Sequence, residues 1–541
     1  MVLINMRLLL TFCCFVLALP VLCVLGSWVT LDAGALAVLQ HQARTVLGGY
    51  ALQSTLLALG VGVGVVALGS ALAVAVALFE FPGRRIFEWA LLLPLAMPAY
   101  VLAYAWTDAL QFSGPVQTAL RAAFGLQGAL WPDPRNAWGA VALFVLCLYP
   151  YVYLLARASL AERAVPLIEA ARLLGAGPRR RLVEVALPLA RPAVAAGAAL
   201  ALMEVLADYG VGSYFGLTTF STGIYKAWLV MNDRVAAAQL ASVLLAVVTA
   251  LLLAERWARR RMRFAAGRNA TRASADARPI ALRGTALAGV LALCALPVLL
   301  GFVLPVAWLG WLLWQEALYS EFGLPLARFA GWAWSSFKLA AIAAAAATVL
   351  ALALGFVLRR RRRGVLPAAA RVLSLGYAIP GAVIAVGILL PVGWLQQRWP
   401  DAPITAVVTG TLFGLVYACL VRFSAVALQS VEAGYARLPG SIDESARLLG
   451  GGPRRLFFEL HLPLLHRSAL AAALLVFVDV MKELPATLVL RPFGSDTLAV
   501  VAYNFARDER LAEAALPSLA IVAVGLIPVV MLARAMARPP T

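Results

Sequence analysis

Long apolar stretches alternate with short polar ones along almost the whole chain. Most of these stretches are close to the twenty or so residues that a helix needs to cross a bilayer. In the first half they cover approximately residues 6–28, 52–79, 86–106, 138–155, 190–207 and 235–254. In the second half they cover approximately residues 285–313, 334–358, 366–390, 404–421, 468–480 and 514–532. The sequence therefore predicts an all-α polytopic membrane protein with about twelve transmembrane helices.

The first apolar stretch has a competing interpretation. Residues 6–28 begin with a weak positive charge at Arg7 and could form a cleaved signal peptide. However, no convincing small-residue cleavage site precedes a soluble domain, and further apolar stretches follow. We interpret residues 6–28 as a spanning helix.

Composition and charge support this class and indicate an orientation. Of the 541 residues, 63% are hydrophobic and only 13% are charged, which excludes an ordinary soluble protein. The formal net charge is +19, but the arginines lie in loops and lack the interleaved aromatic residues of a nucleic-acid surface. Because cytoplasmic loops are rich in arginine and lysine, we expect these loops and both termini to be cytoplasmic.

An internal repeat dominates the loops. Residues 169–189 read EAARLLGAGPRRRLVEVALPL, and residues 444–464 read ESARLLGGGPRRLFFELHLPL, so the numbering of the two copies differs by 275 (444 − 169). Each copy predicts a helix, a break at Gly-x-Gly-Pro, and a short amphipathic helix that ends near Leu-Pro. With six spans in each half, both copies face the same compartment, so the repeat is parallel rather than inverted. Two equal helical loops on one face indicate a two-fold partner.

The repeat also defines the domain organisation. We expect a first half at residues 1–254, a cytoplasmic linker at 255–283 that contains nine arginines, and a second half at 284–541. Longer loops at residues 107–136, 208–234 and 483–513 then lie outside the cell membrane. A soluble delivery protein could dock on them.

The repeated loops resemble the EAA loop of ABC-importer permeases. The resemblance rests on the spacing of Glu, Ala, Gly, Leu and Pro in each copy, with Ser445 in place of one alanine. In that family the loop is the coupling helix, which docks on the ATPase subunit. The residues that the resemblance assigns to ATPase coupling are Glu169, Ala171, Gly175, Pro178, Leu187 and Pro188, and Glu444, Ala446, Gly450, Pro453, Leu462 and Pro463.

The resemblance implies a type I importer permease with two pseudo-symmetric six-helix halves. It also implies its partners: two copies of an ABC ATPase at the cytoplasmic face, a periplasmic binding protein at the outer face, and the lipid bilayer of a bacterial inner membrane. The chain has no G-x-x-x-x-G-K-[ST] phosphate loop and no nucleophile with a nearby base, so it has no ATPase or other catalytic site of its own. ATP and magnesium would bind to the partner ATPase, and this chain would bind no cofactor.

Two pairs of acidic residues follow the repeated loops at the same offset. Glu204 and Asp208 are four residues apart, as are Asp479 and Glu483, so each pair is expected on one helical face near the outer end of its span. Acidic residues in a membrane usually face protein or water and often line a transport path. Alternatively, Lys482, Lys226 or Arg491 could pair with them in a structural role.

Other candidate groups suggest no chemistry. The six cysteines lack metal-ligand spacing and predict buried thiols, and no metal site is firmly assigned. His41, His461 and His466 are widely separated or on the loop surface and are interpreted as ordinary interface or surface histidines.

The segments around the acids narrow the resemblance. EVLADYGVGSYFGLTTFSTGIYKAW and DVMKELPATLVLRPFGSDTLAVVAYNFARDE resemble the corresponding parts of fused, two-half ferric iron permeases, with thiamine permeases next closest. The resemblance implies transport of ferric iron, with thiamine or another small cation as the alternative. A secondary transporter driven by an ion gradient would explain twelve spans and membrane acids, but not paired EAA loops.

Overall fold

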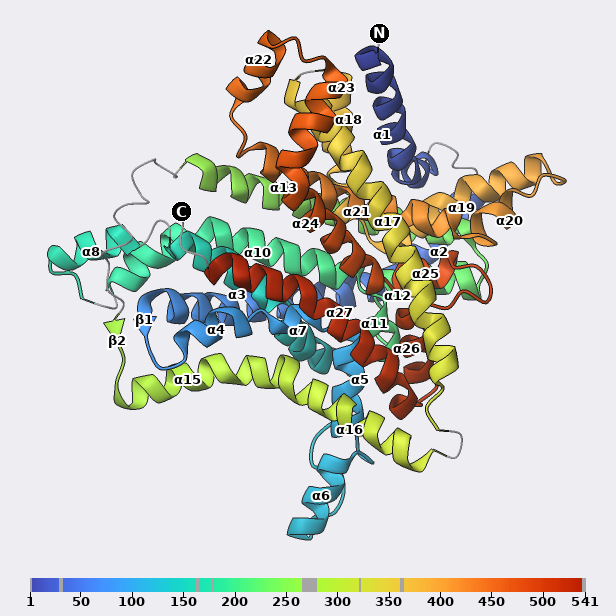
Figure 1. Cartoon of the computed structure of the whole chain (residues 1–541). Helices are drawn as coiled ribbons and strands as arrows, with labels where there is room; N and C mark the ends of the chain where they lie inside the picture. Colours follow the sequence, from blue (N-terminus) through green and yellow to red (C-terminus); the bar gives the residue numbers. More distant parts are fainter. Residues whose placement is uncertain are drawn as a thin grey trace. The chain divides into compact units, whose positions relative to one another are not determined.

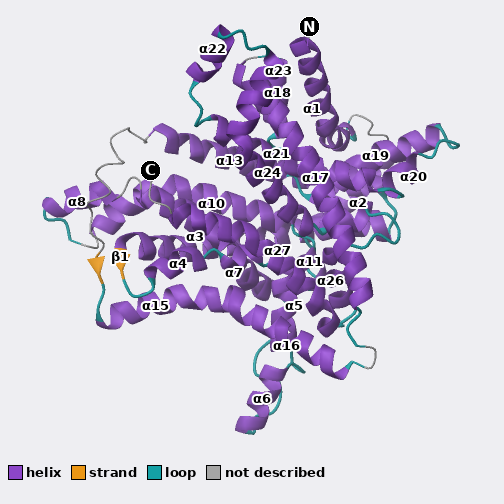
Figure 2. Cartoon of the chain, viewed as in Figure 1, coloured by secondary structure: helices purple, strands orange, loops and turns teal. Residues whose placement is uncertain are grey.

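The computed structural model is almost entirely helical and describes residues 2–28, 33–161, 165–177, 180–264, 280–320, 323–360 and 364–537 (Figure 2). Within these residues, ten helices are long and apolar enough to span a membrane, and two bent helix pairs raise the number to twelve if each pair is one span. This result agrees with the expected number of spans and with an all-α membrane fold.

The helices group into two compact units, and each unit draws on both halves of the sequence. Unit 1 consists of residues 1–44, 223–245 and 325–501, and unit 2 consists of residues 45–222, 246–324 and 502–541. The chain therefore crosses between the units several times. The predicted domain boundaries at residues 254 and 284 describe the repeat in sequence and stay a prediction. Most of the linker, residues 265–279, lies outside the described residues.

Figure 1 labels the α-helices and strands of both units. Unit 1 contains α1 (Val2–Gly26), η4 (Lys226–Val230), α17 (Leu326–Arg360), α18 (Val365–Leu373), η6 (Gly376–Ala378), α19 (Gly381–Arg398), α20 (Ile404–Thr409), α21 (Leu412–Tyr435), α22 (Gly440–Leu448), α23 (Pro453–Arg455), η7 (Leu456–His461), α24 (Leu462–Met481) and α25 (Pro485–Leu490).

Unit 2 contains α3 (Leu47–Leu78), β1 (Phe79–Glu80), α4 (Arg84–Ala90), η1 (Leu93–Ala96), α5 (Ala99–Leu110), α6 (Pro115–Phe124), α7 (Ala137–Ser159), α8 (Val165–Leu173), η3 (Arg181–Ala186), α10 (Leu187–Ala207), α11 (Gly210–Tyr214), β2 (Ile280–Ala281), α15 (Gly284–Val298), η5 (Leu299–Val303), α16 (Leu304–Tyr319) and α27 (Leu511–Ala537). Residues of both units form α2 (Ala33–Thr45), α12 (Phe220–Tyr225), α13 (Arg234–Phe264) and α26 (Leu498–Arg507). The two short strands pair in parallel, with Phe79 opposite Ile280.

Small residues bring the helices of unit 2 close together. A Cβ atom added at Gly60 or Gly64 of α3 would lie 2.9 Å and 2.3 Å from methyl groups of Val141 and Val145 on α7. Such close backbone approach is the usual basis of helix packing in membranes, where lipid and leucine are equally apolar.

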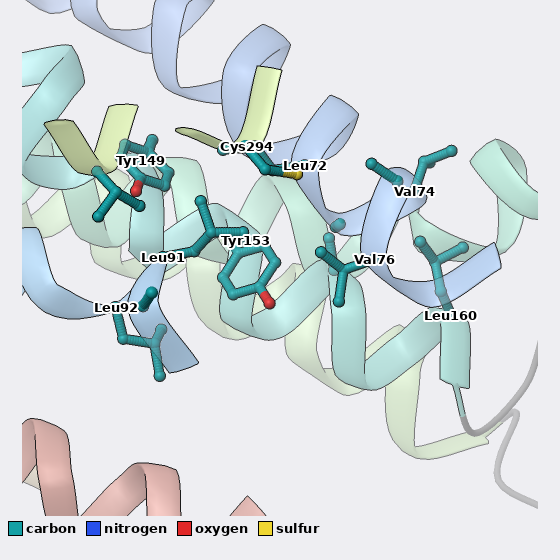
Figure 3. Packing of buried hydrophobic residues seen from close by; sticks show 14 of the residues in the cluster. Leu72, Val74, Val76, Leu91, Leu92, Tyr149, Tyr153, Leu160 and Cys294 are labelled. Carbon is teal, nitrogen blue, oxygen red and sulfur yellow. The ribbon is translucent and has the colours of Figure 1, made fainter. Parts of the chain in front are cut away.

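Large side chains fill the space next to this contact. Tyr149 and Tyr153 of α7 gather with Leu72 and Val76 of α3 and with Leu91 and Leu92 after α4 (Figure 3). The Tyr153 hydroxyl donates a hydrogen bond of 3.1 Å to the Glu88 carbonyl. The cluster fixes α3, α4 and α7 as one body next to the first repeated loop.

Two predicted spans are broken rather than straight. The third predicted span forms α4, η1 and α5, with a bend of 90°, and its counterpart in the second half forms α18, η6 and α19, with a bend of 119°. The breaks fall at Pro98 and Pro380, where Met97 and Ile379 are extended. The cause is local, because proline removes an N–H donor and disfavours helical backbone in the preceding residue.

One predicted span was misplaced. The sequence predicted a helix over residues 404–421, which ends one residue before Arg422. The structure instead contains the short α20 and then α21, Leu412–Tyr435, so Arg422 lies well inside a spanning helix. A buried ion pair with Glu483 explains how α21 holds this charge.

Candidate functional site

The first repeated loop is a helical hairpin closed by glycine. Helix α8 ends at Leu173, and Gly175 follows with a φ of +80°, in the left-handed region. The backbone N–H of Gly175 donates to the Arg172 carbonyl (3.0 Å), and that of Ala176 donates to the Ala171 carbonyl (2.9 Å). These bonds satisfy carbonyls that the helix end would otherwise leave open.

The second loop repeats this geometry residue by residue. Gly450 has a φ of +78°, and the N–H of Gly451 donates to the Ala446 carbonyl at 2.9 Å. After each turn an arginine binds a glutamate four residues later: Arg180 to Glu184 at 2.7 Å, and Arg455 to Glu459 at 2.6 Å. The predicted helix, break and helix are therefore present in both copies.

Each loop has a pair of solvent-exposed leucines at its tip. The exposed fractions are 87% and 88% for Leu173 and Leu174, and 88% and 85% for Leu448 and Leu449. Such exposure at the tip of a hairpin indicates a surface that another protein covers. The exposed leucines are in the motif, but the sequence did not show that they point outward.

The coupling residues predicted from the motif occupy the expected elements. Glu169 and Ala171 lie in α8, and Glu444 and Ala446 lie in α22, where the Glu444 side chain is exposed. Nothing is described of the Glu169 side chain, and Pro178 lies outside the described residues. Pro453 begins α23. The arrangement does not test their role in coupling, which stays a prediction.

The expected helix end at Leu-Pro is wrong in both copies. The π-helical turns η3 and η7 lead directly into α10 and α24, which begin at Leu187 and Leu462. The following residues, Pro188 and Pro463, have no N–H and would clash with the carbonyl four residues earlier, and a wider π turn accommodates them. The second helix of each hairpin is thus the beginning of a spanning helix.

The second loop is fastened to its unit by a buried charge network. The Asp443 carboxylate accepts a hydrogen bond from Arg359 Nε at 2.9 Å and bonds to His461 Nε2 at 3.0 Å. The other ring nitrogen of His461 bonds to the Tyr435 hydroxyl at 3.2 Å. The first copy of the repeat has Ile168, Ala186 and Leu160 at the positions that correspond to Asp443, His461 and Tyr435, so it cannot form this network.

This network corrects the interpretation of His461 as an ordinary interface or surface residue, because its side chain is only 1% exposed. Burial opposes ionisation of Asp443, but hydrogen bonds from Arg359 and His461 outweigh it and hold the pKa of Asp443 below its usual value. Arg359 also donates to the carbonyls of Tyr435 and Leu438 near the end of α21.

The four predicted acids divide equally between the units. Glu204 lies in α10 of unit 2 and Asp479 lies in α24 of unit 1. The expectation that each pair shares one helical face is wrong, because α10 ends at Ala207 and α24 ends at Met481, before the second acid of each pair. Asp208 and Glu483 instead lie two residues before the short helices α11 and α25.

Both second acids cap the helix that follows them. Asp208 Oδ1 accepts hydrogen bonds from the N–H groups of Val211 (2.8 Å) and Gly212 (3.4 Å) at the start of α11. Glu483 accepts hydrogen bonds from the N–H groups of Ala486 and Thr487 in α25, each at 3.0 Å. A side-chain oxygen in this position satisfies donors that the helix start leaves open.

Glu483 is also ion-paired within unit 1. Arg422 of α21 donates to Glu483 Oε1 at 3.2 Å, and both side chains are almost fully buried. The predicted partners were Lys482, Lys226 and Arg491, whereas Arg491 pairs with Asp496. The sequence missed this pair because Arg422 and Glu483 are far apart along the chain and belong to different helical segments.

No metal cluster accompanies the acids. Within the part of the chain that the structure describes, no group of three or more His, Cys, Asp or Glu side chains could hold a metal ion. The six cysteines are all free thiols, and four of them are buried.

Comparisons with known proteins identify the family of this chain. Residues 65–264 match the model of the family "Binding-protein-dependent transport system inner membrane component". An Fe(3+)-transport system permease of Haemophilus influenzae is 25% identical over 459 residues, which is 84% of this chain and 83% of that protein. A molybdenum transport system permease of Escherichia coli is 30% identical over 195 residues, 82% of its own length. The chain belongs to the binding-protein-dependent permease family.

A third relative extends the comparison. The ferric transport system permease of Actinobacillus pleuropneumoniae is 24% identical over 448 residues, which is 77% of this chain and 61% of that protein. Membership of the permease family agrees with the resemblance carried by the two loops and with a multi-pass inner-membrane protein. The family description itself says that transport depends on a binding protein.

Proposed function

We propose that this permease forms the membrane passage of an ATP-driven importer that moves ferric iron from a periplasmic binding protein into the cytoplasm. The observation that carries the proposal is the pair of matching loops, each of which exposes two leucines beside a glycine turn. The chain has no ATP-binding motif, so two copies of a partner ATPase would bind ATP and magnesium.

The continuity of each loop with a spanning helix supports a coupling mechanism. The segments η3 with α10 and η7 with α24 are helical without interruption from Arg181 to Ala207 and from Leu456 to Met481. A displacement of the loop by a closing ATPase pair would therefore move a whole membrane helix as a rigid body. Flexible loops would absorb the same displacement.

The arginine distribution supports an orientation. We place both repeated loops and both termini in the cytoplasm, and the loops with α6, α11 and α25 on the outer side, where the binding protein would dock. The parallel repeat then gives two equivalent ATPase sites on one face.

The names of two relatives that match most of this chain support iron as the substrate. Two relatives that match more than three-quarters of the chain are described as Fe(3+) or ferric transport permeases. The molybdenum permease matches only 35% of this chain. Thiamine, suggested by sequence resemblance, has no support from these relatives.

The contacts of the acids refine the proposed path. Glu204, Asp208, Asp479 and Glu483 were predicted to receive the substrate. Glu483 is committed to Arg422 and to the start of α25, which favours a structural role. Asp208 makes no ion pair with any described residue, and it is the acid that we favour for contact with a cation.

Uptake in proteoliposomes tests the proposal. The permease is reconstituted with its ATPase and binding protein, and uptake of radiolabelled ferric iron, thiamine and molybdate is compared with and without ATP. We expect ATP-dependent uptake of iron alone. Uptake of thiamine or molybdate without iron would overturn the substrate, and uptake driven by an ion gradient without ATPase would overturn the class of transporter.

A further inference from the structure

Hydroxyl groups gather in unit 2 at the end of α10 that is distant from the first loop. With a rise of about 1.5 Å per residue, the 27 residues from Arg181 to Ala207 separate the two ends by about 40 Å. The hydroxyl groups come from α5, α11 and its preceding residue, and the part of α26 that belongs to unit 2. They belong to Tyr100, Tyr104, Tyr209, Ser213, Tyr214 and Tyr503, which we call the tyrosine cluster.

Three of these oxygens already have the spacing of neighbouring metal ligands. Ser213 Oγ and the Tyr503 hydroxyl are 2.8 Å apart, and the Tyr503 and Tyr209 hydroxyls are 3.3 Å apart. A small hard cation with octahedral bonds of about 2.0 Å holds adjacent oxygens about 2.8 Å from one another. A hydrogen-bonded chain has similar spacing, so a second observation is needed to indicate a ligand.

The second observation is a buried phenol without a hydrogen-bond partner. Tyr104 is 1% exposed, and among the described residues its hydroxyl has no partner. Its ring packs edge-on against Tyr214, with centroids 4.8 Å apart, and its hydroxyl interacts electrostatically with Tyr503 and Asp208. An unsatisfied buried hydroxyl costs about 1–3 kcal/mol, and a bound ligand would remove this penalty.

The charges around the cluster favour a cation. The Asp208 carboxylate lies directly before Tyr209, and the position of the repeat that corresponds to Arg422 holds Cys147, which supplies no positive charge. Arg135 lies 5.9 Å from the centre of the Tyr214 ring and is paired with Glu509 at 3.2 Å. Arg507, whose charge acts on Tyr503, lies 3.7 Å from the Asp508 carboxylate. Among the described residues, no basic side chain is thus ion-paired with the Asp208 carboxylate.

The repeat shows that the cluster is specific to unit 2. With the offset of 275, the residues of unit 1 that correspond to Tyr209, Ser213 and Tyr214 are Leu484, Leu488 and Val489. Around Pro98, which aligns with Pro380, the offset is 282, and the residues that correspond to Tyr100 and Tyr104 are Ala382 and Val386. In unit 1 the matching acid, Glu483, is bound by Arg422. Unit 1 therefore has apolar residues and an ion-paired acid at these positions. Unit 2 has hydroxyl groups and an acid, Asp208, that forms no ion pair with a described residue.

We infer that the tyrosine cluster and Asp208 form a transient binding site for Fe(III), with Tyr104, Tyr209, Tyr503 and the Asp208 carboxylate as oxygen ligands. The inference rests on the proposed function for the identity of the ion. Phenolate and carboxylate oxygens are hard ligands that suit a small, highly charged cation. Each phenol that coordinates releases its proton to water, and the iron stays ferric throughout.

Spectroscopy tests the site without reference to transport. Ferric nitrilotriacetate is added to the purified full-length permease, and the visible phenolate-to-Fe(III) charge-transfer band is recorded. We expect a band in the wild type, loss of most of it in Tyr209→Phe, Tyr503→Phe, and its retention in Tyr149→Phe. Tyr149 is a matched control, because it is also a buried tyrosine with an unpartnered hydroxyl but lies in the cluster of Figure 3. No band in the wild type would overturn the site.

Uptake separates failure of the site from failure of the proposed function. We expect ATP-dependent iron uptake to fall at least tenfold in Tyr104→Phe, Tyr209→Phe at equal protein abundance, and to stay within twofold of the wild type in Tyr149→Phe. Undiminished iron uptake in the double variant would overturn the site and leave the transporter assignment intact. Absence of iron uptake in the wild type would instead overturn the proposed function.

Discussion

Two glycines control the shape of both loops. Gly175 and Gly450 have φ angles of +80° and +78°, and no atom lies within 4 Å of where a Cβ would be. An added side chain would thus meet open space. The substitution would still cost about 1–2 kcal/mol per residue, because a residue with a Cβ is unfavourable in the left-handed conformation. We predict that Gly175→Val, Gly450→Val distorts both hairpins and lowers transport and transport-linked ATP hydrolysis at least fivefold, measured at normal membrane levels.

A matched control is available two residues further on. Gly177 and Gly452 also have open space around a Cβ, and neither has a positive φ. Gly177→Val, Gly452→Val should therefore leave ATP hydrolysis near the wild-type rate. Equal activity of the two double variants would contradict the role of the left-handed turn.

At this scale the sequence could predict local features and not distant partners. Gly-x-Gly-Pro indicates a helix end wherever it occurs, so both turns were predictable. The partner of Asp443 was not, because Arg359 is 84 residues away in another helix. For the same reason the tyrosine cluster, which joins Tyr104 near the start of the chain to Tyr503 near its end, left no pattern in the sequence.

Among the elements, the two loop helices differ in how they are attached. Asp443 of α22 is bound by Arg359 and His461 in a buried network, whereas α8 has Ile168 at that position. Removing one partner of a buried ion pair costs about 3–5 kcal/mol, because the other charge stays buried and unpaired. We predict that Asp443→Asn loosens α22, seen as hydrogen–deuterium exchange in residues 440–448 that is at least tenfold faster than in the wild type.

The control for this experiment is an exposed pair in the same loop. Arg455 and Glu459 are both about two-thirds exposed, and such pairs contribute about 0–1 kcal/mol. Glu459→Gln should change exchange in residues 440–448 by less than twofold. Exchange that is unchanged in Asp443→Asn would show that the network does not hold α22.

The sequence predicted helix boundaries where hydropathy changes sharply. It missed boundaries that depend on a proline or on an ion pair. The bends at Pro98 and Pro380 lie inside continuous apolar stretches, so hydropathy alone predicts one straight helix at each. The boundary of α21 was predictable from the repeat: residues 138–155 moved by 275 become 413–430, close to the observed Leu412–Tyr435. Hydropathy failed there because Arg422 interrupts the apolar stretch while Glu483 neutralises it.

For the whole molecule, the two structural units do not coincide with the two halves of the sequence repeat. Each unit takes helices from both halves: α1 and part of α13 join the second half in unit 1, and α15, α16 and α27 join the first half in unit 2. The sequence indicated two equal halves, but only long-range packing shows which helices each unit contains.

The repeat also predicts on which side of the membrane the loops of each unit lie. Leu173 in unit 2 and Leu448 in unit 1 mark the repeated loops, while Phe124 in unit 2, 71% exposed, and Phe493 in unit 1, fully exposed, mark the loops predicted on the outer side. If six spans form each half, both leucines are cytoplasmic and both phenylalanines are outside. Single replacements by cysteine test this with a membrane-impermeant maleimide.

We expect Phe124→Cys and Phe493→Cys to react in cells with a permeabilised outer membrane, and Leu173→Cys and Leu448→Cys to react only in inverted vesicles. The unmodified chain gives the background from its six thiols, of which Cys13 and Cys23 are partly exposed. Adding the partner ATPase to the vesicles should slow labelling of Leu173→Cys and Leu448→Cys alike, because each leucine pair would be covered by one ATPase copy. Labelling of these two positions from opposite sides would make the repeat inverted, and one permease could then not engage two ATPases at a single face.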